Sequence, residues 1–350
     1  MPELAPILSP SRRPTLRDVA DRAGVSVQTA SNVVHERFDR MGAATRVRVQ
    51  DATLELGYHP NLTARGLRSA RTRTLGFLVL DEAPSFLADP LTDLLIAGVG
   101  DVARDEDYGV LLQGERPLAE ARSLLRPLLE RRVDGACVLM SGDPALRRSY
   151  IEQLSATGVP FVVFDELVED PNVLSVRTDE RDCARRLVEY LLHAGHERFG
   201  FIAAKLPWAV VEQRHLGYRD ALAAAGVRHL PEFERFEATW QAQGGEQMAS
   251  ELLEHPTPPS AIVCGSDVLA IGAIHAARRL GRRVPDDVAV CGFDDFEFSR
   301  FVDPPLTTVR VDGYEQGRRA ARMLVDGLDG RAVDQPHVLL HNQLIVRESA

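Results

Sequence analysis

The sequence predicts an α + α/β protein, with an N-terminal helix-turn-helix domain followed by a two-lobed α/β domain. Three observations support this prediction. Between Thr15 and Gly57, apolar residues recur at helical spacing in short blocks that glycines end. From Thr74 onward, apolar runs typical of buried parallel strands alternate with amphipathic helical stretches. The charge also changes: residues 1–73 hold 12 of the 41 basic and 7 of the 51 acidic residues, so the remainder holds 29 basic and 44 acidic residues.

Composition excludes several classes of protein. A chain of 350 residues with 45% apolar content can bury more than one core. Its apolar runs stay below the roughly 18 residues of a membrane helix, and "MPELAPILSPSRR" lacks the features of a secretory signal. The four cysteines lack metal-ligand spacing, so we expect reduced thiols, no metal and no cofactor. Residues 1–73, here called the head, are basic, and the remainder, here called the body, is acidic. This suggests that the head binds a polyanion, and a solvated charged face is the alternative.

Three short helices are predicted in the head. Thr15 and Asp18 form a T-x-x-D start, close to a capping box, and Gly24 ends this first helix. Ser26 is a suitable N-cap for a second helix, and a third is predicted from Thr45 to Leu56. Two helices joined by a glycine turn and braced by a third form the helix-turn-helix arrangement.

The second helix carries amides opposite its apolar side. At about 100° per residue, Gln28 and Asn32 point away from the face of Ala30. Amide side chains can bond two base-edge atoms at once, most naturally adenine N6 and N7 in the major groove. Short hydroxyls on the flanks suit phosphates. A small helical bundle with solvated polar residues is the alternative. The predicted DNA contacts of this helix are Val27, Gln28, Thr29, Ser31 and Asn32.

A conditional fourth helix is predicted over residues 61–69, within a hinge and linker of residues 61–73. Asn61 starts it, but Gly66 and several arginines make it a poor helix in isolation. Leu67 has few apolar neighbours, which suits a wedge between base steps in the minor groove, with guanidinium groups such as that of Arg68 on phosphates. A basic interdomain linker is the alternative.

In the body, polar side chains that follow the predicted strands are candidate ligand contacts. Ligands of parallel sheets bind beyond the carboxyl ends of the strands, and about a dozen strands favour two lobes with a cleft. Carboxylates, an arginine fork and an aromatic face suit a polyhydroxylated ring. Helix caps and structural ion pairs are the alternative for each residue. The candidates are Asp165, Arg214, Ser266, Asp267, Phe293 and Asp294. Whether Asp81, Asp89 and Trp208 also line the cleft stays open.

Motifs in a consistent order carry a family resemblance. In the head they are "TLRDVADRAGVSVQTASNVV", "ELGYHPNLTARGLRS" and "RTRTLGFLV". In the body they are "GVPFVVFDE", "LLHAGHERFGFIAA", "RHLGYRDALAAAG", "GSDVLAIGAIHAARRLG", "VAVCGFDDFEFSRFVDPPLTTVR" and "LIVRES". From about Thr15 to its end, the chain resembles the lactose/galactose repressor (LacI/GalR) family of bacterial transcription regulators. The resemblance implies a periplasmic-binding-protein-like effector domain.

The resemblance also implies residue roles in the head. Val27, Gln28 and Asn32 match the family's base-reading residues, Leu67 its intercalating leucine and Asn61 its hinge-helix start. The chain departs from the family's pattern at Asn32, where arginine is usual, so we expect an operator that differs near the arginine-read guanine. Two further departures are His35, where asparagine is common, and Gly42, which replaces a frequent serine cap of the third helix.

In the body, the resemblance assigns effector contacts. Arg214, Asp294 and Asp165 match effector-holding residues, with Phe293 as a stacking face. Ser266 stands where the family often has asparagine, which leaves the effector's identity open. A sugar or sugar derivative is the first choice, and a nucleobase or nucleoside is the alternative.

We therefore predict a cytoplasmic, nucleoid-associated homodimer that represses transcription at a pseudo-palindromic operator in double-stranded DNA under control of an effector. A solute-binding receptor is an alternative from another class. An enzyme is not expected, because no nucleophile–base pair or metal motif is present. The end, "IVRESA", lacks the leucine-heptad helix of tetrameric members, which favours a dimer. The predicted domains are 1–14, a disordered tail; 15–60, helix-turn-helix; 61–73, hinge helix and linker; and 74–350, effector-binding and dimerisation, with lobe 1 at about 74–177 and 307–336 and lobe 2 at about 178–306 and 337–350.

Overall fold

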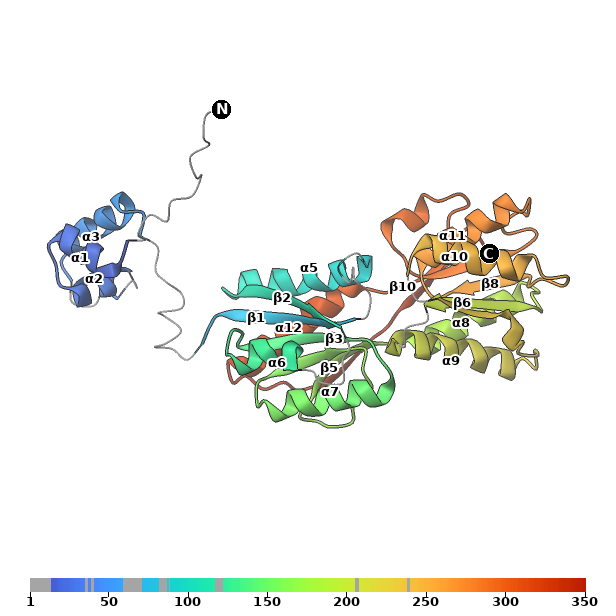
Figure 1. Ribbon diagram of the computed structural model, residues 1–350, viewed down its shortest axis with the longest axis horizontal. Helices are drawn as coiled ribbons and strands as arrows, with labels where there is room; N and C mark the ends of the chain where they lie inside the picture. Colours follow the sequence, from blue (N-terminus) through green and yellow to red (C-terminus); the bar gives the residue numbers. More distant parts are fainter. Residues whose placement is uncertain are drawn as a thin grey trace, which may run out of the picture. The chain divides into compact units, whose positions relative to one another are not determined.

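A computed structural model of the chain forms two compact units, residues 1–72 and 73–350 (Figure 1). The structure describes residues 14–34, 37–38, 41–58, 71–81, 87, 89–116, 122–204, 208–237 and 240–350. Each unit is described by itself below. Within these residues, no helix is both long and apolar enough to cross a membrane.

The first unit contains three short helices, α1 (Leu16–Ala23), α2 (Val27–Val34) and α3 (Ala43–Glu55). The predicted capping box is confirmed, because Asp18 N donates to Thr15 Oγ1 at 3.3 Å and Thr15 N donates to Asp18 Oδ2 at 2.7 Å. Gly24 ends α1 in the left-handed conformation, with φ of 66°.

The three helices share a small apolar core. Thr29 N donates to the predicted cap Ser26 Oγ at 3.1 Å, and α3 starts two residues before the predicted Thr45. Gly42 caps α3 without a side-chain hydrogen bond. Apolar side chains of all three helices meet, which gives the helix-turn-helix arrangement its stability. The core residues are Val19, Ala20, Ala23, Ala30, Val33, Val49 and Ala52.

The first lobe of the second unit is a parallel sheet covered on both faces. Its strand order is β11-β5-β4-β3-β1-β2. Side chains alternate along β1, so that Phe77 packs in the core cluster of α5 and α12 and Leu78 in that of α6 and α7. Figure 1 shows α5 on one side of this sheet and α6 and α7 on the other. The elements are β1 (Thr74–Leu80), α5 (Pro90–Asp105), β2 (Gly109–Glu115), α6 (Arg122–Leu129), β3 (Gly135–Met140), α7 (Pro144–Ala156), β4 (Phe161–Phe164), β5 (Leu174–Thr178), α12 (Gly313–Leu328) and β11 (His337–Leu340).

The second lobe repeats this architecture. Its strand order is β12-β10-β9-β8-β6-β7, parallel except for the β10–β12 pair. Helices α8 and α9 cover one face, and α10 and α11 cover the other. The elements are α8 (Glu180–His193), β6 (Phe199–Ala204), α9 (Ala209–Ala224), η2 (Pro231–Phe233), β7 (Glu234–Glu237), α10 (Ala242–Leu253), β8 (Ala261–Cys264), α11 (Asp267–Arg279), β9 (Ala289–Asp294), η3 (Glu297–Arg300), β10 (Thr307–Arg310) and β12 (Gln343–Ile345).

Two glycines allow α10 and α11 to pack backbone against backbone. A Cβ atom at Gly272 of α11 would lie 2.0 Å from the carbonyl oxygen of Ala242. A Cβ atom at Gly245 of α10 would lie 2.2 Å from the carbonyl oxygen of Leu269. Both separations are far below van der Waals contact, so only glycine fits at either position.

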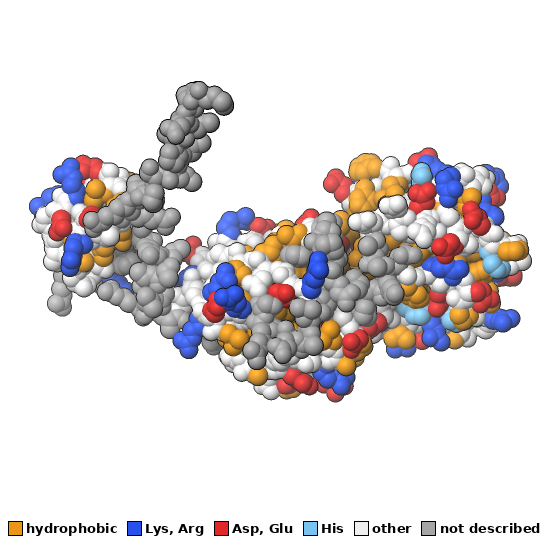
Figure 2. All heavy atoms as spheres, in the orientation of Figure 1, with side chains coloured by type: hydrophobic (Ala, Val, Ile, Leu, Met, Phe, Trp, Pro, Cys, Tyr) orange, Lys and Arg blue, Asp and Glu red, His pale blue; other side chains and the backbone are white. Residues whose placement is uncertain are grey.

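The chain crosses between the lobes at residue 179, residues 311–312 and residues 341–342. Two predicted boundaries were therefore wrong by a few residues. The strand at 307–310, expected in the first lobe, pairs with β9 of the second sheet, and the strand at 337–340, expected in the second lobe, pairs with β5 of the first. Both strands stay paired to their ends, so the crossings fall after them. On the face seen in Figure 2, acidic and basic side chains are interspersed over both lobes.

Candidate functional site

Two amide side chains lie together on the exposed face of α2. Gln28 Nε2 donates a hydrogen bond to Asn32 Oδ1 at 3.1 Å. Val27, at the start of the helix, is 41% exposed. Residues four apart on a helix are neighbours on its surface, so Gln28 and Asn32 offer their donors and acceptors side by side, as predicted.

The two predicted hydroxyl contacts of α2 differ in exposure. Thr29 is half-buried, and its Oγ1 lies 2.8 Å from Ser26 Oγ. Ser31 is only 6% exposed, which corrects the expectation that it lies on an open flank. The buried face of α2 is wide enough to include it beside Ala30. The remaining predicted DNA contacts, Asn61, Leu67 and Arg68, lie outside the described residues.

In the second unit, Arg214 is the centre of a buried charge network. Its Nε donates to Glu180 Oε2 at 2.6 Å, its Nη1 to the carbonyl oxygen of Gly265 at 2.7 Å, and its Nη2 to Asp294 Oδ1 at 3.2 Å. Arg214 is 2% exposed. Burial opposes its charge, but Glu180 and Asp294 outweigh this effect and raise the pKa of Arg214. The guanidinium is therefore a fixed cation where β8 and β9 end.

Phe293 supports this arginine and does not form an open stacking face. Its ring is fully buried, and the guanidinium carbon of Arg214 lies 4.5 Å from the ring centroid. This is cation–π geometry. The predicted stacking of a ligand on Phe293 is therefore wrong, because Arg214 already covers the ring.

Glu180 was not predicted from the sequence, although it completes the network. Besides Arg214 it accepts hydrogen bonds from Thr178 Oγ1 at 2.7 Å and Asn342 Nδ2 at 3.0 Å. Thr178 directly precedes the first crossing between the lobes and Asn342 lies in the third, so Glu180 joins the hinge to the cation. The one available signal was the acidic pair in "SVRTDE", directly after a strand.

Asp165 contributes a carboxylate from the first lobe. It follows β4 with φ of 57°, and Asp294 ends β9 with φ of 108°, a region that residues other than glycine rarely adopt. Such backbone strain concentrates at functional sites. Gln316 Nε2 donates to Asp165 Oδ1 at 2.7 Å. Burial, and secondly the charge of Glu180, raise the pKa of Asp165 to about 7.

Two predicted effector contacts are structural instead. Ser266 caps α11, since its Oγ accepts from Leu269 N at 3.3 Å. Asp267 is fully buried and accepts hydrogen bonds from Phe296 N and from the hydroxyls of Ser299 and Thr308. Its carboxylate ties α11 to the segments on either side of η3, which corrects its assignment to the ligand. Ser266 is therefore a helix cap, whereas Asp267 binds uncharged donors and forms no ion pair among the described residues.

Two of the residues whose role the sequence did not decide lie near the cleft. Asp89 caps α5 through Leu91 N at 3.1 Å, and burial raises its pKa although the charge of Arg214 opposes this. The backbone of Trp208 forms an isolated antiparallel β-bridge with the backbone of Ser141 in the other lobe. Its Nε1 atom and the Oγ atom of Ser141 are buried without a hydrogen-bond partner among the described residues. These two groups can therefore serve a molecule held between the lobes.

The open part of the cleft measures about 840 Å³, a volume within the range of small-molecule sites. Both lobes line it, with Asp165 and Arg147 from the first and Glu180, Glu212 and Gln213 from the second. Carboxylates outnumber arginines, so the lining offers acceptors to hydroxyl and N–H donors and opposes an anion.

Comparison with known proteins covers nearly the whole chain. Residues 15–61 match the family of bacterial regulatory proteins, lacI family, and residues 188–350 match a periplasmic binding protein-like domain. The HTH-type transcriptional repressor CytR of Escherichia coli (strain K12) is 33% identical over 337 residues, 96% of each chain. The regulator CelR of Thermobifida fusca is 33% identical over 341 residues, 97% of this chain and 98% of CelR.

Solved structures of similar proteins have the same architecture. The lac repressor dimer bound to operator and the anti-inducer ONPF superimposes with a TM-score of 0.84 at 27% identity, over 97% of this chain and 99% of that one. The CelR–cellobiose complex gives 0.71 at 31% identity, over 97% and 100%. The relatives named here are transcriptional regulators, in agreement with the expectation that the chain is not an enzyme.

Proposed function

The chain belongs to the lacI family of bacterial regulatory proteins and is a DNA-binding transcriptional regulator, and we propose that it acts as a homodimeric repressor whose operator affinity is set by a ligand in the cleft. The buried charge network around Arg214 carries this proposal. A buried cation held by Glu180 and Asp294, beside a cleft lined by both lobes, has the arrangement of a small-molecule site. We place the protein in the cytoplasm, where the nucleoid is accessible.

For DNA recognition, we propose that α2 enters the major groove and reads bases with Val27, Gln28 and Asn32. The paired exposed amides of α2 support this role. Thr29 would contact phosphates, and Ser31, which is buried beside Ala30, is the weaker candidate for such a contact. Asn61, Leu67 and Arg68 remain proposals for a hinge helix that opens the central minor groove. A dimer places two such heads on a pseudo-palindromic site.

For the effector, we propose a neutral sugar or sugar derivative, held by Asp165, Arg214 and Asp294. The excess of carboxylates supports a ligand rich in hydroxyl donors, and a relative of known structure is a cellobiose complex. A nucleobase or nucleoside is the second candidate, because the Trp208 Nε1 donor and the Ser141 hydroxyl, which lack a hydrogen-bond partner within the described part of the chain, suit ring nitrogen and carbonyl groups. The ligand must bind one lobe arrangement better than the other to shift DNA affinity.

Two experiments test these proposals. Selection from a random duplex pool should yield a pseudo-palindromic site, and no preference over bulk genomic DNA would contradict the repressor function. The effector screen uses Trp208 as its probe, since the chain has two tryptophans and Trp240→Phe leaves only Trp208. A panel of neutral sugars and nucleosides should contain a compound that raises the melting temperature and changes Trp208 fluorescence. A second panel holds phosphorylated and acidic compounds, and if only members of this second panel act, the proposed neutral ligand is wrong.

A further inference from the structure

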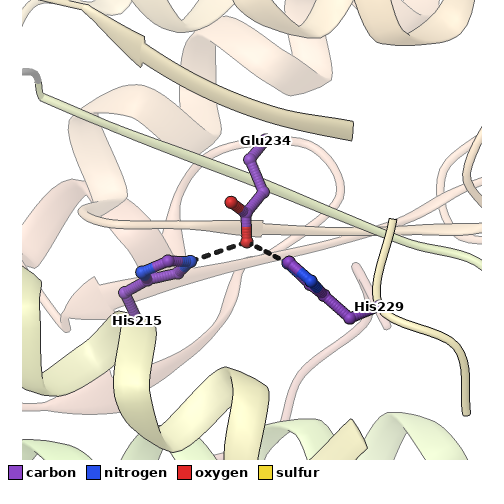
Figure 3. Close-up of side chains that lie close together, drawn as sticks. All are labelled: His215, His229 and Glu234. Carbon is purple, nitrogen blue, oxygen red and sulfur yellow. Dashed lines mark hydrogen bonds and ion pairs between the residues drawn. The ribbon is translucent and has the colours of Figure 1, made fainter. Parts of the chain in front are cut away.

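Two histidines and a glutamate converge on the outer edge of the second lobe, away from the cleft network. His215 lies on α9, His229 in the connection between α9 and η2, and Glu234 at the start of the edge strand β7. Both imidazole Nε2 atoms lie 2.6 Å from the same carboxylate oxygen, Oε1 of Glu234. Figure 3 shows the two rings directed at this oxygen from opposite sides.

Aromatic rings hold the two imidazoles in place. The His215 ring stacks on Tyr218 at 17° between planes and meets Phe236 edge-on, with centroids 5.6 Å apart. The His229 ring meets Tyr218 edge-on at 6.5 Å. The apolar contacts restrict ring rotation, so the Nε2 atoms keep their direction toward Glu234. A polar centre inside an apolar shell is the usual setting of a protein metal site.

We propose that His215, His229 and Glu234 bind a divalent transition-metal ion, with Zn²⁺ as the best match. Two imidazoles and one carboxylate are a known three-ligand set for Zn²⁺, which completes its tetrahedron with water. The three donor atoms already lie within 4.8 Å of one another. With metal–ligand bonds of about 2.0–2.2 Å, tetrahedral geometry separates donor atoms by about 3.3 Å.

Two adjustments would admit the ion. Each Nε2–Oε1 separation must widen from 2.6 Å by about 0.7 Å, and the two Nε2 atoms, which lie within 4.8 Å of each other, must approach to about 3.3 Å. Each imidazole then carries its proton on Nδ1, which leaves the Nε2 lone pair for the metal. The side chains of His215 and His229 are 23% and 26% exposed, so the ion can enter from solvent.

Bound metal would cross-link three consecutive segments, namely α9, the loop after it, and β7. His215 directly follows Arg214, so the ion would also hold the helix that carries the buried cation of the cleft. Binding to the folded state alone stabilises it, and the affinity of the ion becomes stability of the second lobe.

The test is titration of the full-length protein, without a polyhistidine tag and after chelator treatment, with ZnCl2 in a calorimeter. We expect saturable binding of one ion per chain and a higher melting temperature with zinc. His229→Ala and His215→Asn should each weaken binding by more than the roughly 10–100-fold that loss of an outer-shell partner costs. His275→Ala is the matched control, because His275 lies 3.1 Å from Glu246 on the same lobe without a third ligand among the described residues.

Two results would overturn the metal site. One is the absence of saturable 1:1 binding by the natural chain, a result that does not depend on any variant. The other is binding that His229→Ala leaves unchanged. Cobalt substitution decides the case if a variant fails to fold: a tetrahedral Co²⁺ spectrum without a thiolate band supports this site, whereas a thiolate band assigns the ion to one of the four buried cysteines.

Discussion

Arg147 of the first lobe binds Glu212 of the second across the cleft, with Nη2 2.9 Å from Oε2. Its Nε also lies 2.8 Å from Glu166 in its own lobe. Arg147 is 4% exposed, whereas Glu212 is half-buried. The pair therefore stabilises the lobe arrangement seen here, and its strength is limited by solvent on the Glu212 side.

Removing this cross-lobe pair should destabilise the unit modestly. We expect Glu212→Gln to lower the free energy of unfolding by about 1 kcal/mol, because Arg147 keeps Glu166 and only the partly exposed partner is lost. Urea denaturation measures the change. Asp220→Asn breaks the exposed Arg181–Asp220 pair within the second lobe and serves as control. A loss in the control equal to that in Glu212→Gln would show that crossing the cleft confers no special stability.

Replacement of the central cation should be far more costly. Arg214→Met leaves Glu180 and Asp294 buried without their counter-charge, which we expect to cost about 3–5 kcal/mol at neutral pH. Arg214→Lys keeps the charge but loses the fork, and should fold while losing the response to effector. DNA binding by the head should persist in this variant. An unchanged effector response, measured by operator release or capture, would place the pocket elsewhere.

Asp165 should make stability depend on pH. Its pKa of about 7 in the folded protein exceeds the roughly 3.9 of an unfolded chain. The folded state therefore holds this proton more tightly, and the stability it contributes is full below about pH 4 and is lost as pH rises toward 7. Asp165→Asn cannot titrate. From pH 4 to 7, the melting temperature of the natural chain should fall relative to the variant by several degrees.

An exposed carboxylate, that of Asp220, should give a pH dependence of stability of the opposite sign and serves as a control. The hydrogen bond from Arg181 lowers the pKa of Asp220, so its contribution is present above the unfolded pKa and is lost as pH falls. Relative to Asp220→Asn, the natural chain should gain stability as pH rises through about 4. Parallel melting curves for the natural chain and Asp165→Asn would contradict the raised pKa of Asp165.

The amide pair on α2 predicts a defined change in base preference. Asn32→Arg should shift selection at one base position of each half-site toward guanine, because arginine pairs with guanine O6 and N7. Gln50→Arg adds the same charge to an exposed position of α3 and should strengthen binding to all sequences alike. Selection from a random duplex pool distinguishes the two. Identical preferences in Asn32→Arg and the natural chain would remove α2 from base reading.

The glycine contact between α10 and α11 predicts a steric effect. Gly272→Ala forces these helices apart and should cost about 1–3 kcal/mol or more, as overpacking does. Gly327→Ala, near the end of α12, meets nothing within 4 Å and should be neutral or slightly stabilising. Thermal unfolding of both variants measures the difference. Equal effects would mean that α10 and α11 can separate without loss.

Much of the architecture could be predicted because local signals decide it. The cap at Thr15, the left-handed Gly24 and the alternation of strands with helices each follow from residues close in sequence. The lobe crossings were misplaced because strand pairing extends across them: β10 and β11 follow turn signals at Pro305 and Pro336, but the chain changes lobes only after each strand ends.

The cleft was harder to predict, for a different reason. Asp165, Arg214 and Asp294 do follow strands as expected, but a sequence does not say which side chain receives the hydrogen bonds of its neighbours. Asp267 is committed to Ser299 and Thr308, Phe293 is covered by Arg214, and Glu180 enters from a hinge. These are contacts between residues up to about 160 positions apart, which no local pattern reveals.

Strands β11 and β12 lie next to each other in the chain but extend opposite sheets. During synthesis, therefore, the first lobe lacks its last strand until residue 340 has been added, and the second lobe lacks its last strand until residue 345 has been added. The three helices of the head need only residues 15–58 and can assemble long before. A nascent chain can thus carry a folded head while its sensor is still incomplete, a stage that lasts for the time taken to translate residues 59–345.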